Sequence, residues 1–201
     1  MMNIISKIWL NSAAFFDPVQ YFFNGNFWSE FLKRFGSFSH GRIVDLACGT
    51  GELRKYTEPS DYLGLDQNSG YIALAQKRFP LKNTRFEVGD ILKQGYTDNP
   101  DTIFLISAAH HLADDQISLL AKNLKQSRIK RFILVDGYPI GSFALPLAFL
   151  DAYLGGGKYF RNDQQLVALI KPHLKVTDSG EFSAQASFYR YPYLVATTIN
   201  P

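Results

Sequence analysis

Five short apolar runs recur along the middle of the chain. Each is rich in β-branched or aromatic residues and is apolar nearly throughout, with no regular alternation of polar positions. Strands that are covered on both faces have this pattern, as in a parallel sheet with helices on either side. We therefore predict buried strands at residues 42–47, 61–66, 85–90, 102–107 and 131–137.

Segments with a helical repeat precede, separate and follow these strands. In each, apolar residues recur every three or four positions, which gives a helix one buried face. Ser69 is suited to cap the second segment, and Asp114 and Asp115 are suited to the positive end of the third helix dipole. The predicted helices cover residues 27–38, 69–79, 114–126 and 162–173.

The alternation of strands and helices predicts an α/β fold with a doubly wound, mostly parallel sheet of seven strands. The last two strand-like runs, residues 174–182 and 189–199, have no helix between them and predict a C-terminal antiparallel hairpin at the sheet edge. We place Pro192 at the start of the last strand, where its missing N–H does least harm.

All 201 residues are expected to form one domain, since this length is typical of a single core. Within it we distinguish a helical and aromatic N-terminal part, a central core of strands and helices, an apolar insertion, and the last helix with its hairpin. Their bounds are residues 1–40, 41–137, 138–160 and 161–201.

Composition and charge exclude several classes of protein. Hydrophobic residues make up 46% and charged residues 19% of the chain, which excludes a disordered tail, a collagen-like fibre and a coiled coil. The net charge of +3 is too small to indicate nucleic acid as a partner, and the basic stretch 122–131 has the pattern of a solvated helix end. Cys48 is the only cysteine, so neither an internal disulfide nor a metal site is expected, and a reducing, cytoplasmic setting fits.

Neither a signal peptide nor a transmembrane span is expected. The N-terminal apolar stretch is broken by Asn11 and Ser12. The longest apolar run, residues 137–157, has the length of a membrane span but holds two prolines, five glycines and Asp151.

The first predicted strand carries an acid, Asp45, and runs into a loop that holds Gly49 and Gly51. These glycines allow a tight turn and a close approach of the backbone to a ligand. We expect a helix to begin at Glu52 and to direct its free N–H groups at that ligand. The alternative is a plain strand-to-helix turn, which requires neither the two glycines nor the acid.

Acids also end the next two strands, at the edge where open α/β sheets bind ligands. Asp66 follows Gly49 by 17 residues, a spacing that suits a carboxylate accepting hydrogen bonds from a ribose diol. Its alternative role is to cap the following helix. Asp90 suits an exocyclic amine such as that of adenine, with Ile91 beside it supplying a backbone N–H and an apolar wall. A strand-end turn is the alternative there.

Arg54 stands where the dinucleotide-binding fingerprint has its third glycine, and the chain has no Walker-type lysine. A bulky residue at that position hinders the close packing of helix on strand beside a pyrophosphate. The residues therefore favour an adenosine ligand without phosphates and disfavour a nicotinamide oxidoreductase, which stays as an alternative.

The sequence IVDLACGTGEL, residues 43–53, resembles the first motif of the class I S-adenosylmethionine-dependent methyltransferases. The segments YLGLDQNSGYIALAQKRF, FEVGDIL, TIFLISAAHHLADD and RFILVDG resemble the later motifs of that family, in order. The resemblance covers about residues 41–137 and the closing hairpin. It implies the Rossmann-like methyltransferase fold, S-adenosylmethionine as cofactor and methyl transfer as the reaction.

Carried over to this chain, the resemblance implies a role for each residue of the site. Asp45 and the loop 47–51 would hold the methionine part, and the backbone carbonyl of Ser107 would contact its amine. Asp66, with Gln67 beside it, would hold the ribose, and Asp90 with Ile91 the adenine. We interpret Cys48 as a packing residue. The implied cofactor site is Asp45, Ala47, Cys48, Gly49, Gly51, Asp66, Gln67, Asp90, Ile91 and Ser107.

His110 and His111 follow the fourth predicted strand, on the ligand-binding edge, and either is a candidate catalytic base for a hydroxyl or amine acceptor. The resemblance also allows a structural role, because a histidine near this position often packs between loop and helix in the family. The strand end lacks the Asn-Pro-Pro-aromatic sequence of enzymes that methylate nucleic-acid base amines.

Two aromatic segments lie outside the cofactor core, in the N-terminal part and in residues 138–160. Our hypothesis is that they form a lid over a small hydrophobic or aromatic acceptor. Packing as extra core and a surface for lipid or a partner are the alternatives. A cofactor-binding protein without transfer activity is the alternative function.

Overall fold

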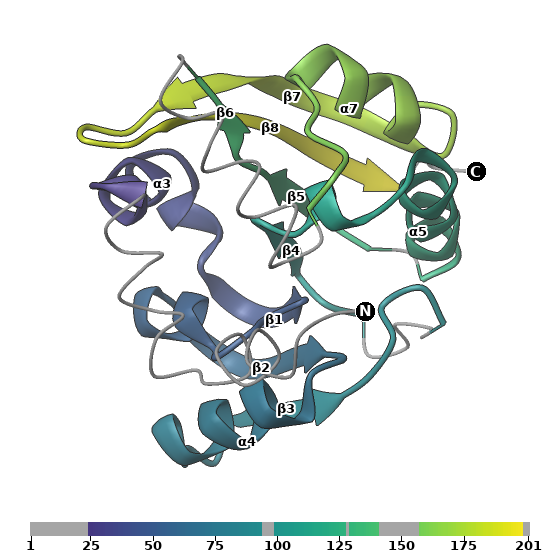
Figure 1. Ribbon diagram of the computed structural model, residues 1–201. Coiled ribbons are helices and arrows are strands. Elements are labelled where there is room, and N and C mark those ends of the chain that lie inside the picture. The colour runs from purple at the N-terminus through teal and green to yellow at the C-terminus, as the bar shows by residue number, and fades with distance from the viewer. Residues whose placement is uncertain (1–23, 94–98, 128, 141–156, 199–201) are drawn as a thin grey trace, which may run out of the picture.

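The computed structural model describes residues 24–93, 99–127, 129–140 and 157–198 (Figure 1). The first elements are helix α3 (Phe27–Phe35), strands β1 (His40–Leu46) and β2 (Glu58–Asp66), helix α4 (Ser69–Arg78) and strands β3 (Thr84–Val88) and β4 (Thr102–Ile106). They are followed by α5 (Asp114–Gln126), β5 (Phe132–Val135), β6 (Tyr138–Pro139), α7 (Asp163–Ile170), β7 (Leu174–Ser183) and β8 (Tyr189–Thr198). Short 3-10 helices are η1 (Gly36–Phe38), η2 (Glu52–Tyr56) and η3 (Ala109–His111).

All strands of the described residues belong to one mixed sheet. Its order is β3-β2-β1-β4-β5-β8, and both β6 and β7 pair with β8. Strands β1 to β5 are parallel, whereas β8 runs antiparallel to β5, β6 and β7. The predicted fold class is confirmed: a mostly parallel, doubly wound sheet with antiparallel strands at its C-terminal end. The described residues form eight strands rather than the expected seven, because a short extra strand, β6, follows β5 just beyond the predicted run 131–137.

Pro192 explains why β5 and β6 are separate strands, and it does not lie at the start of the last strand, where we predicted it. It lies inside β8, between the residues that pair with β5 and those that pair with β6. The N–H of Asp136 donates to the carbonyl of Pro192 at 3.0 Å. An ordinary antiparallel pair would return a second bond, but proline has no N–H to donate. The ladder is therefore interrupted at Asp136, directly after β5.

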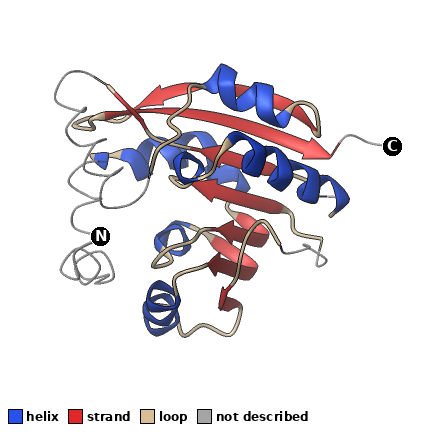
Figure 2. Ribbon diagram, turned by 45° about the vertical axis from the view of Figure 1, so that its right-hand side comes forward, coloured by secondary structure: helices blue, strands red, loops and turns tan. Residues whose placement is uncertain are grey.

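Helices cover both faces of the sheet, as the unalternating apolar runs require. Helices α5 and α7 lie together on one face and bury Ile117, Leu120, Leu124 and Leu166 against it. Helices α3 and α4 cover the opposite face, where the core is aromatic (Figures 1 and 2). The predicted buried faces of the helices are confirmed, and successive residues of one strand, such as Phe104 and Leu105, belong to opposite cores.

The described part of the N-terminal segment packs as core. Phe27, Phe31 and Phe35 are buried against Tyr191 and other aromatic residues of that face, and Trp28 stacks on Tyr56 with 4.6 Å between ring centroids. Residues 1–23, and residues 141–156 of the apolar insertion, lie outside the described residues. In the part of the chain that the structure describes, no helix has the length and apolar character that crossing a membrane requires.

Candidate active site

The loop after β1 turns through three residues with left-handed backbone. Ala47, Gly49 and Gly51 have φ angles of 54°, 54° and 80°. A Cβ at Gly51 would lie 2.9 Å from the ring of Phe86, so packing requires that glycine. At Gly49 a Cβ would meet none of the described residues within 4 Å, so nothing in the described part of the chain crowds this side of the loop.

The helix that we expected to begin at Glu52 does not form. The described chain makes only the 3-10 helix η2, five residues long, and β2 begins two residues later. Arg54 is one reason, because its guanidinium reaches across to Thr84 Oγ1 at 2.9 Å and to the carbonyl of Thr57 at 2.8 Å. Donors for a ligand therefore have to come from the backbone of the loop itself, not from the end of a long helix dipole.

Ala47 occupies a backbone conformation that costs an L-residue roughly 1–2 kcal/mol. Ala47→Gly is expected to stabilise the fold by about 0.5–1 kcal/mol, after the greater entropy of glycine in the unfolded chain is subtracted. Urea or thermal unfolding measures the change. Ala75→Gly, in the middle of α4, is the control with the opposite sign, a loss of about 1 kcal/mol. Equal losses in both variants would contradict strain at Ala47.

Asp66 ties the glycine loop to the end of β2. Its Oδ2 accepts from the backbone N–H of Gly49 and its Oδ1 from that of Asn68, both at 2.8 Å. Carboxylate oxygens have further lone pairs for the hydroxyls of a ligand. Asn68 rather than Ser69 caps α4, since its side chain accepts from the N–H groups of Gly70 and Tyr71. Gln67 is exposed beside Asp66.

Asp45 is buried at the end of β1 and accepts a hydrogen bond from the hydroxyl of Tyr62 on β2, with 2.6 Å between the oxygens. Burial raises the pKa of Asp45 to about 7; the hydrogen bond from Tyr62 opposes this and the negative charge of Asp66 adds to it. Burial likewise holds the pKa of Tyr62 well above its usual range, so the phenol stays a donor. The carboxyl of Asp45 therefore changes charge near neutral pH.

Three further predicted residues follow the ends of strands. Asp90 Oδ1 accepts from the N–H of Leu92 at 2.9 Å, so Asp90 supports the turn after β3. The side chain of Ile91 is buried in the core on the α5 side rather than lining an open wall. Ser107 directly follows β4 with a left-handed φ of 52°, and its N–H donates to the carbonyl of Val135 at 2.8 Å. Non-glycine residues held in this conformation often mark functional sites.

Cys48 lies in the same loop and packs inward. It is buried beside Gly64, where an added Cβ would come within 2.9 Å of its Sγ. Burial, with the nearby charges of Asp45 and Asp66, raises the pKa of its thiol far above the usual range. A thiol that stays protonated is no nucleophile, which agrees with the packing role that we predicted.

His110 and Asp136 form a buried dyad where β4 and β5 end. His110 Nδ1 lies 2.7 Å from Asp136 Oδ1, and both residues are buried. His111 is exposed, with its ring centroid 4.2 Å from that of His110. The structure thus distinguishes the two candidates, because His110 is buried against a carboxylate whereas His111 lies at the surface.

Asp136 was not among the candidate residues predicted from the sequence. The signal was present, since Asp136 lies at the carboxyl end of a predicted strand, as Asp66 and Asp90 do. Its pairing with His110, 26 residues away, required the sheet order, in which β4 and β5 are neighbours.

The fold, with acids at the ends of β1, β2 and β3, is typical of a nucleoside-binding α/β protein. Residues 43–127, which hold the glycine loop, these acids and His110, match the family model described as a methyltransferase domain. Residues 43–127 therefore form a methyltransferase domain, as the motifs indicated, and solved structures of the same fold with bound S-adenosylhomocysteine support S-adenosylmethionine as its cosubstrate. No curated protein sequence matches the chain.

Solved structures share the fold over most of the chain. The magnesium protoporphyrin IX methyltransferase of Synechocystis PCC 6803, with bound S-adenosylhomocysteine, has a TM-score of 0.61 at 17% identity over 99% of this chain and 89% of that one. The complex of DhpI with S-adenosylhomocysteine has a TM-score of 0.69 at 16% identity over 97% and 96%. Human N-acetylserotonin methyltransferase has a TM-score of 0.60 at 16% identity over 79% and 47%.

Proposed function

We propose that this domain methylates a hydroxyl or amine of a small, hydrophobic or aromatic acceptor, with His110 as the catalytic base. The observation that carries the proposal is the buried His110–Asp136 pair at the same sheet edge as the glycine loop. A neutral imidazole whose Nδ1–H is held by a carboxylate has its basic nitrogen at Nε2. A hydroxyl or amine acceptor requires such a group, because its proton must leave as the new bond to carbon forms.

The residues at the strand ends suit the parts of the cosubstrate. Asp66 accepts from the ribose hydroxyls with the lone pairs that Gly49 and Asn68 leave. Ionised Asp45, with the carbonyl of Ser107, faces the methionine ammonium. Asp90 with the backbone of Ile91, and Gln67 beside the ribose, complete the adenosine side. Together the acids offer negative charge to a ligand that is cationic at its sulfonium and its ammonium.

The bound cosubstrate supplies an electrophilic methyl group. The chain contributes alignment, which is the larger part of catalysis for an in-line displacement. Nε2 of His110 takes the acceptor proton, and Asp136 stabilises the imidazolium that results and fixes the ring orientation. Phe160, which stacks on His110 with 5.3 Å between centroids and 11° between planes, supplies an apolar neighbour for the base.

Two observations support a hydrophobic or aromatic acceptor. Next to Phe160, Tyr159 is 41% exposed, so apolar surface lies beside the dyad. Two proteins of the same fold are named for small acceptors, magnesium protoporphyrin IX and N-acetylserotonin. A lid over the acceptor stays a prediction. Of the insertion 138–160 that would form it, the structure describes residues 138–140 and 157–160.

A labelled-methyl transfer assay over panels of phenols, hydroxy-indoles, carboxylic acids and amines tests this function. We expect transfer to at least one hydrophobic hydroxyl or amine compound. Tight binding of S-adenosylhomocysteine without transfer to any panel would instead favour a cofactor-binding protein.

Asp66→Ala is expected to weaken S-adenosylhomocysteine binding by about 1.5–3 kcal/mol, the range for hydrogen bonds to a charged group. Isothermal titration calorimetry measures the dissociation constant. Asp61→Ala is the matched control, since Asp61 lies in the first half of the same strand, five residues before Asp66, and pairs with Arg85 at the surface. An unchanged dissociation constant in Asp66→Ala would refute the ribose role.

A further inference from the structure

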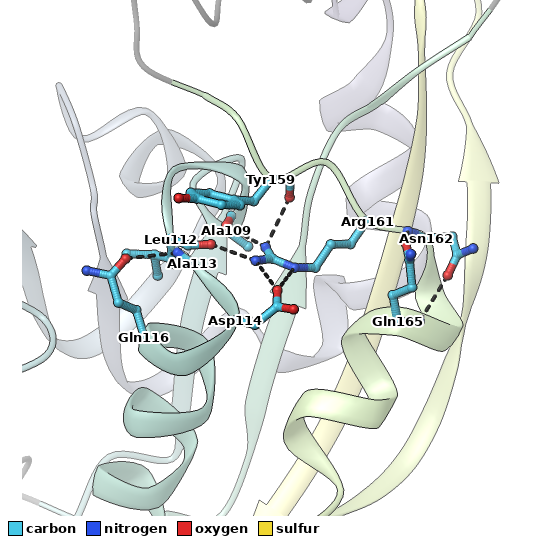
Figure 3. Close-up of polar contacts among 9 residues, drawn as sticks. All are labelled: Ala109, Leu112, Ala113, Asp114, Gln116, Tyr159, Arg161, Asn162 and Gln165. Atoms are coloured by element: carbon cyan, nitrogen blue, oxygen red, sulfur yellow. Dashed lines mark hydrogen bonds and ion pairs between the residues drawn. The ribbon is translucent and has the colours of Figure 1, made fainter.

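Arg161 is a buried cation with an unusual set of partners. Its side chain is 6% exposed, although arginine rarely lies so deep without a specific role in the structure. The guanidinium makes five hydrogen bonds, which join residues 159–161 to the start of α5 and to the ends of η3 (Figure 3). The bonds to Asp114 Oδ1 measure 2.9 Å from Nε and 2.6 Å from Nη2.

The other three bonds of Arg161 end on backbone carbonyls. Nη1 donates to Ala109 at 3.1 Å and to Tyr159 at 3.0 Å, and Nη2 donates to Leu112 at 2.7 Å. Ala109 and Leu112 stand immediately before and after the two histidines. One planar group thus fixes both ends of the single turn that carries His110.

The same chain segment also holds His110 directly. The carbonyl of His110 accepts from the N–H groups of Lys158 and Tyr159, at 2.9 and 3.0 Å. The ring of Phe160 stacks on the imidazole. Residues 158–161 therefore contact the backbone, the ring and the flanking carbonyls of the histidine turn.

Arg161 is itself fixed from the C-terminal side. It directly precedes the capping box of α7 (Figure 3), in which the N–H of Asn162 donates to Gln165 Oε1 at 3.0 Å and the N–H of Gln165 donates to Asn162 Oδ1 at 2.9 Å. Asp114, the carboxylate partner, is 71% exposed, so its charge is largely hydrated. A partly hydrated ion pair adds little stability. The directional bonds to the carbonyls are the stronger reason for this arrangement, because only a planar fork reaches all of them.

We infer that Arg161 is a positioning residue, which orients the His110 imidazole toward Asp136 by fixing the turn η3. The expected effect on catalysis rests on the proposed function of His110, whereas the expected effect on the orientation of its ring does not. Lysine at position 161 keeps the charge and loses the fork. The histidine turn is then held at fewer points, and the fraction of His110 bound to Asp136 falls.

Nitrogen NMR of ¹⁵N-histidine-labelled protein tests this inference without an acceptor. The His110 ring is assigned by the loss of its signals in His110→Gln. In the wild type we expect a single tautomer with the proton on Nδ1. In Arg161→Lys we expect broadened signals and a mixture of tautomers. Arg34→Lys is the matched control, because Arg34 bonds the Tyr193 hydroxyl and lies over its ring, far from η3 in the chain and on the α3 face.

Methyl-transfer kinetics provide a second test of the inference. Arg161→Lys should lower kcat about 10–100-fold, the usual cost of a misplaced catalytic group, while the dissociation constant of S-adenosylhomocysteine stays within about twofold. Altered His110 signals together with a wild-type enzyme that transfers no methyl would support the positioning role and contradict the proposed function.

A lower Tm with His110 signals identical to the wild type would overturn the inference and leave Arg161 a purely structural residue. Asp114→Asn serves if Arg161→Lys does not fold. It keeps the bonds to the carbonyls and weakens the anchor of the guanidinium, so a smaller change of the same kind is expected. Unchanged His110 signals in that variant would equally overturn the inference.

Discussion

Asp136→Asn should lower kcat for methyl transfer by about 10²–10⁴-fold, the range for loss of general base catalysis. An asparagine that turns its amide N–H₂ to His110 Nδ1 moves the imidazole proton to Nε2, where it blocks proton transfer. An asparagine that turns its oxygen keeps the tautomer but no longer stabilises the imidazolium. His110→Gln removes the base outright and should fall in the same range. The labelled-methyl assay, with an acceptor found in the panels, measures both.

The control for this prediction is His173→Gln. His173 also makes one side-chain hydrogen bond, from Nε2 to Ser118 Oγ at 2.9 Å, but it precedes β7 and lies away from the strand ends that form the site. It should change kcat by less than about twofold. Binding of S-adenosylhomocysteine should be unchanged in all three variants, since none of them is assigned to the cosubstrate. A kcat that survives both Asp136→Asn and His110→Gln would mean that the pair is structural.

Asp45→Asn should raise the stability of the ligand-free protein at about pH 8 and weaken the cosubstrate at the same time. The pKa of Asp45 is raised from 3.8 to about 7 in the folded state, so the folded protein holds the proton more tightly than the unfolded chain. That contribution to stability is complete below the unfolded pKa and is lost as the pH rises toward 7. Above this range the ionised buried carboxyl costs about 2–4 kcal/mol, which asparagine does not.

Thermal unfolding checks the stability half of this prediction. At about pH 8 the Tm of Asp45→Asn should exceed the wild-type value by roughly 5–10 °C, while at about pH 4 the two should agree. Calorimetry checks the other half, where S-adenosylhomocysteine should bind about 10–100-fold more weakly, because the ammonium loses its ionised partner. A Tm that does not rise at about pH 8 would contradict the buried charge.

The same carboxyl gives cosubstrate binding a pH dependence. Affinity for S-adenosylhomocysteine should increase as the pH rises from about 5.5 to about 7.5, as Asp45 ionises. Binding of 5′-methylthioadenosine, which has no ammonium, should stay nearly flat over this range. Tyr62→Phe removes the hydrogen bond that lowers the pKa of Asp45, so it should move the rise in affinity to higher pH. Asp66, the other charge that raises this pKa, is kept in that variant.

The sequence by itself determined the elements and the class of ligand. Runs of β-branched and aromatic residues made the central strands predictable, because strands buried on both faces are apolar at nearly every position. The grouping of the loop glycines and the strand-end acids in one site was predictable for a related reason. Parallel strands all bring their carboxyl ends to one edge, so order along the chain is enough to gather Asp45, Asp66 and Asp90 there.

The tertiary structure decided what depends on partners distant in the chain. The helix expected after Gly51 gave way to a 3-10 turn because Arg54 found acceptors on another strand and in the adjoining loop. The break at Asp136 arose from Pro192, whose missing N–H matters only once β8 lies beside β5. The choice of His110 over His111 as the candidate base depends on its contact with Asp136 and on the bonds of Arg161 to the turn that carries it. Local pattern encodes burial and periodicity, whereas the orientation of a catalytic side chain depends on contacts that only the assembled sheet creates.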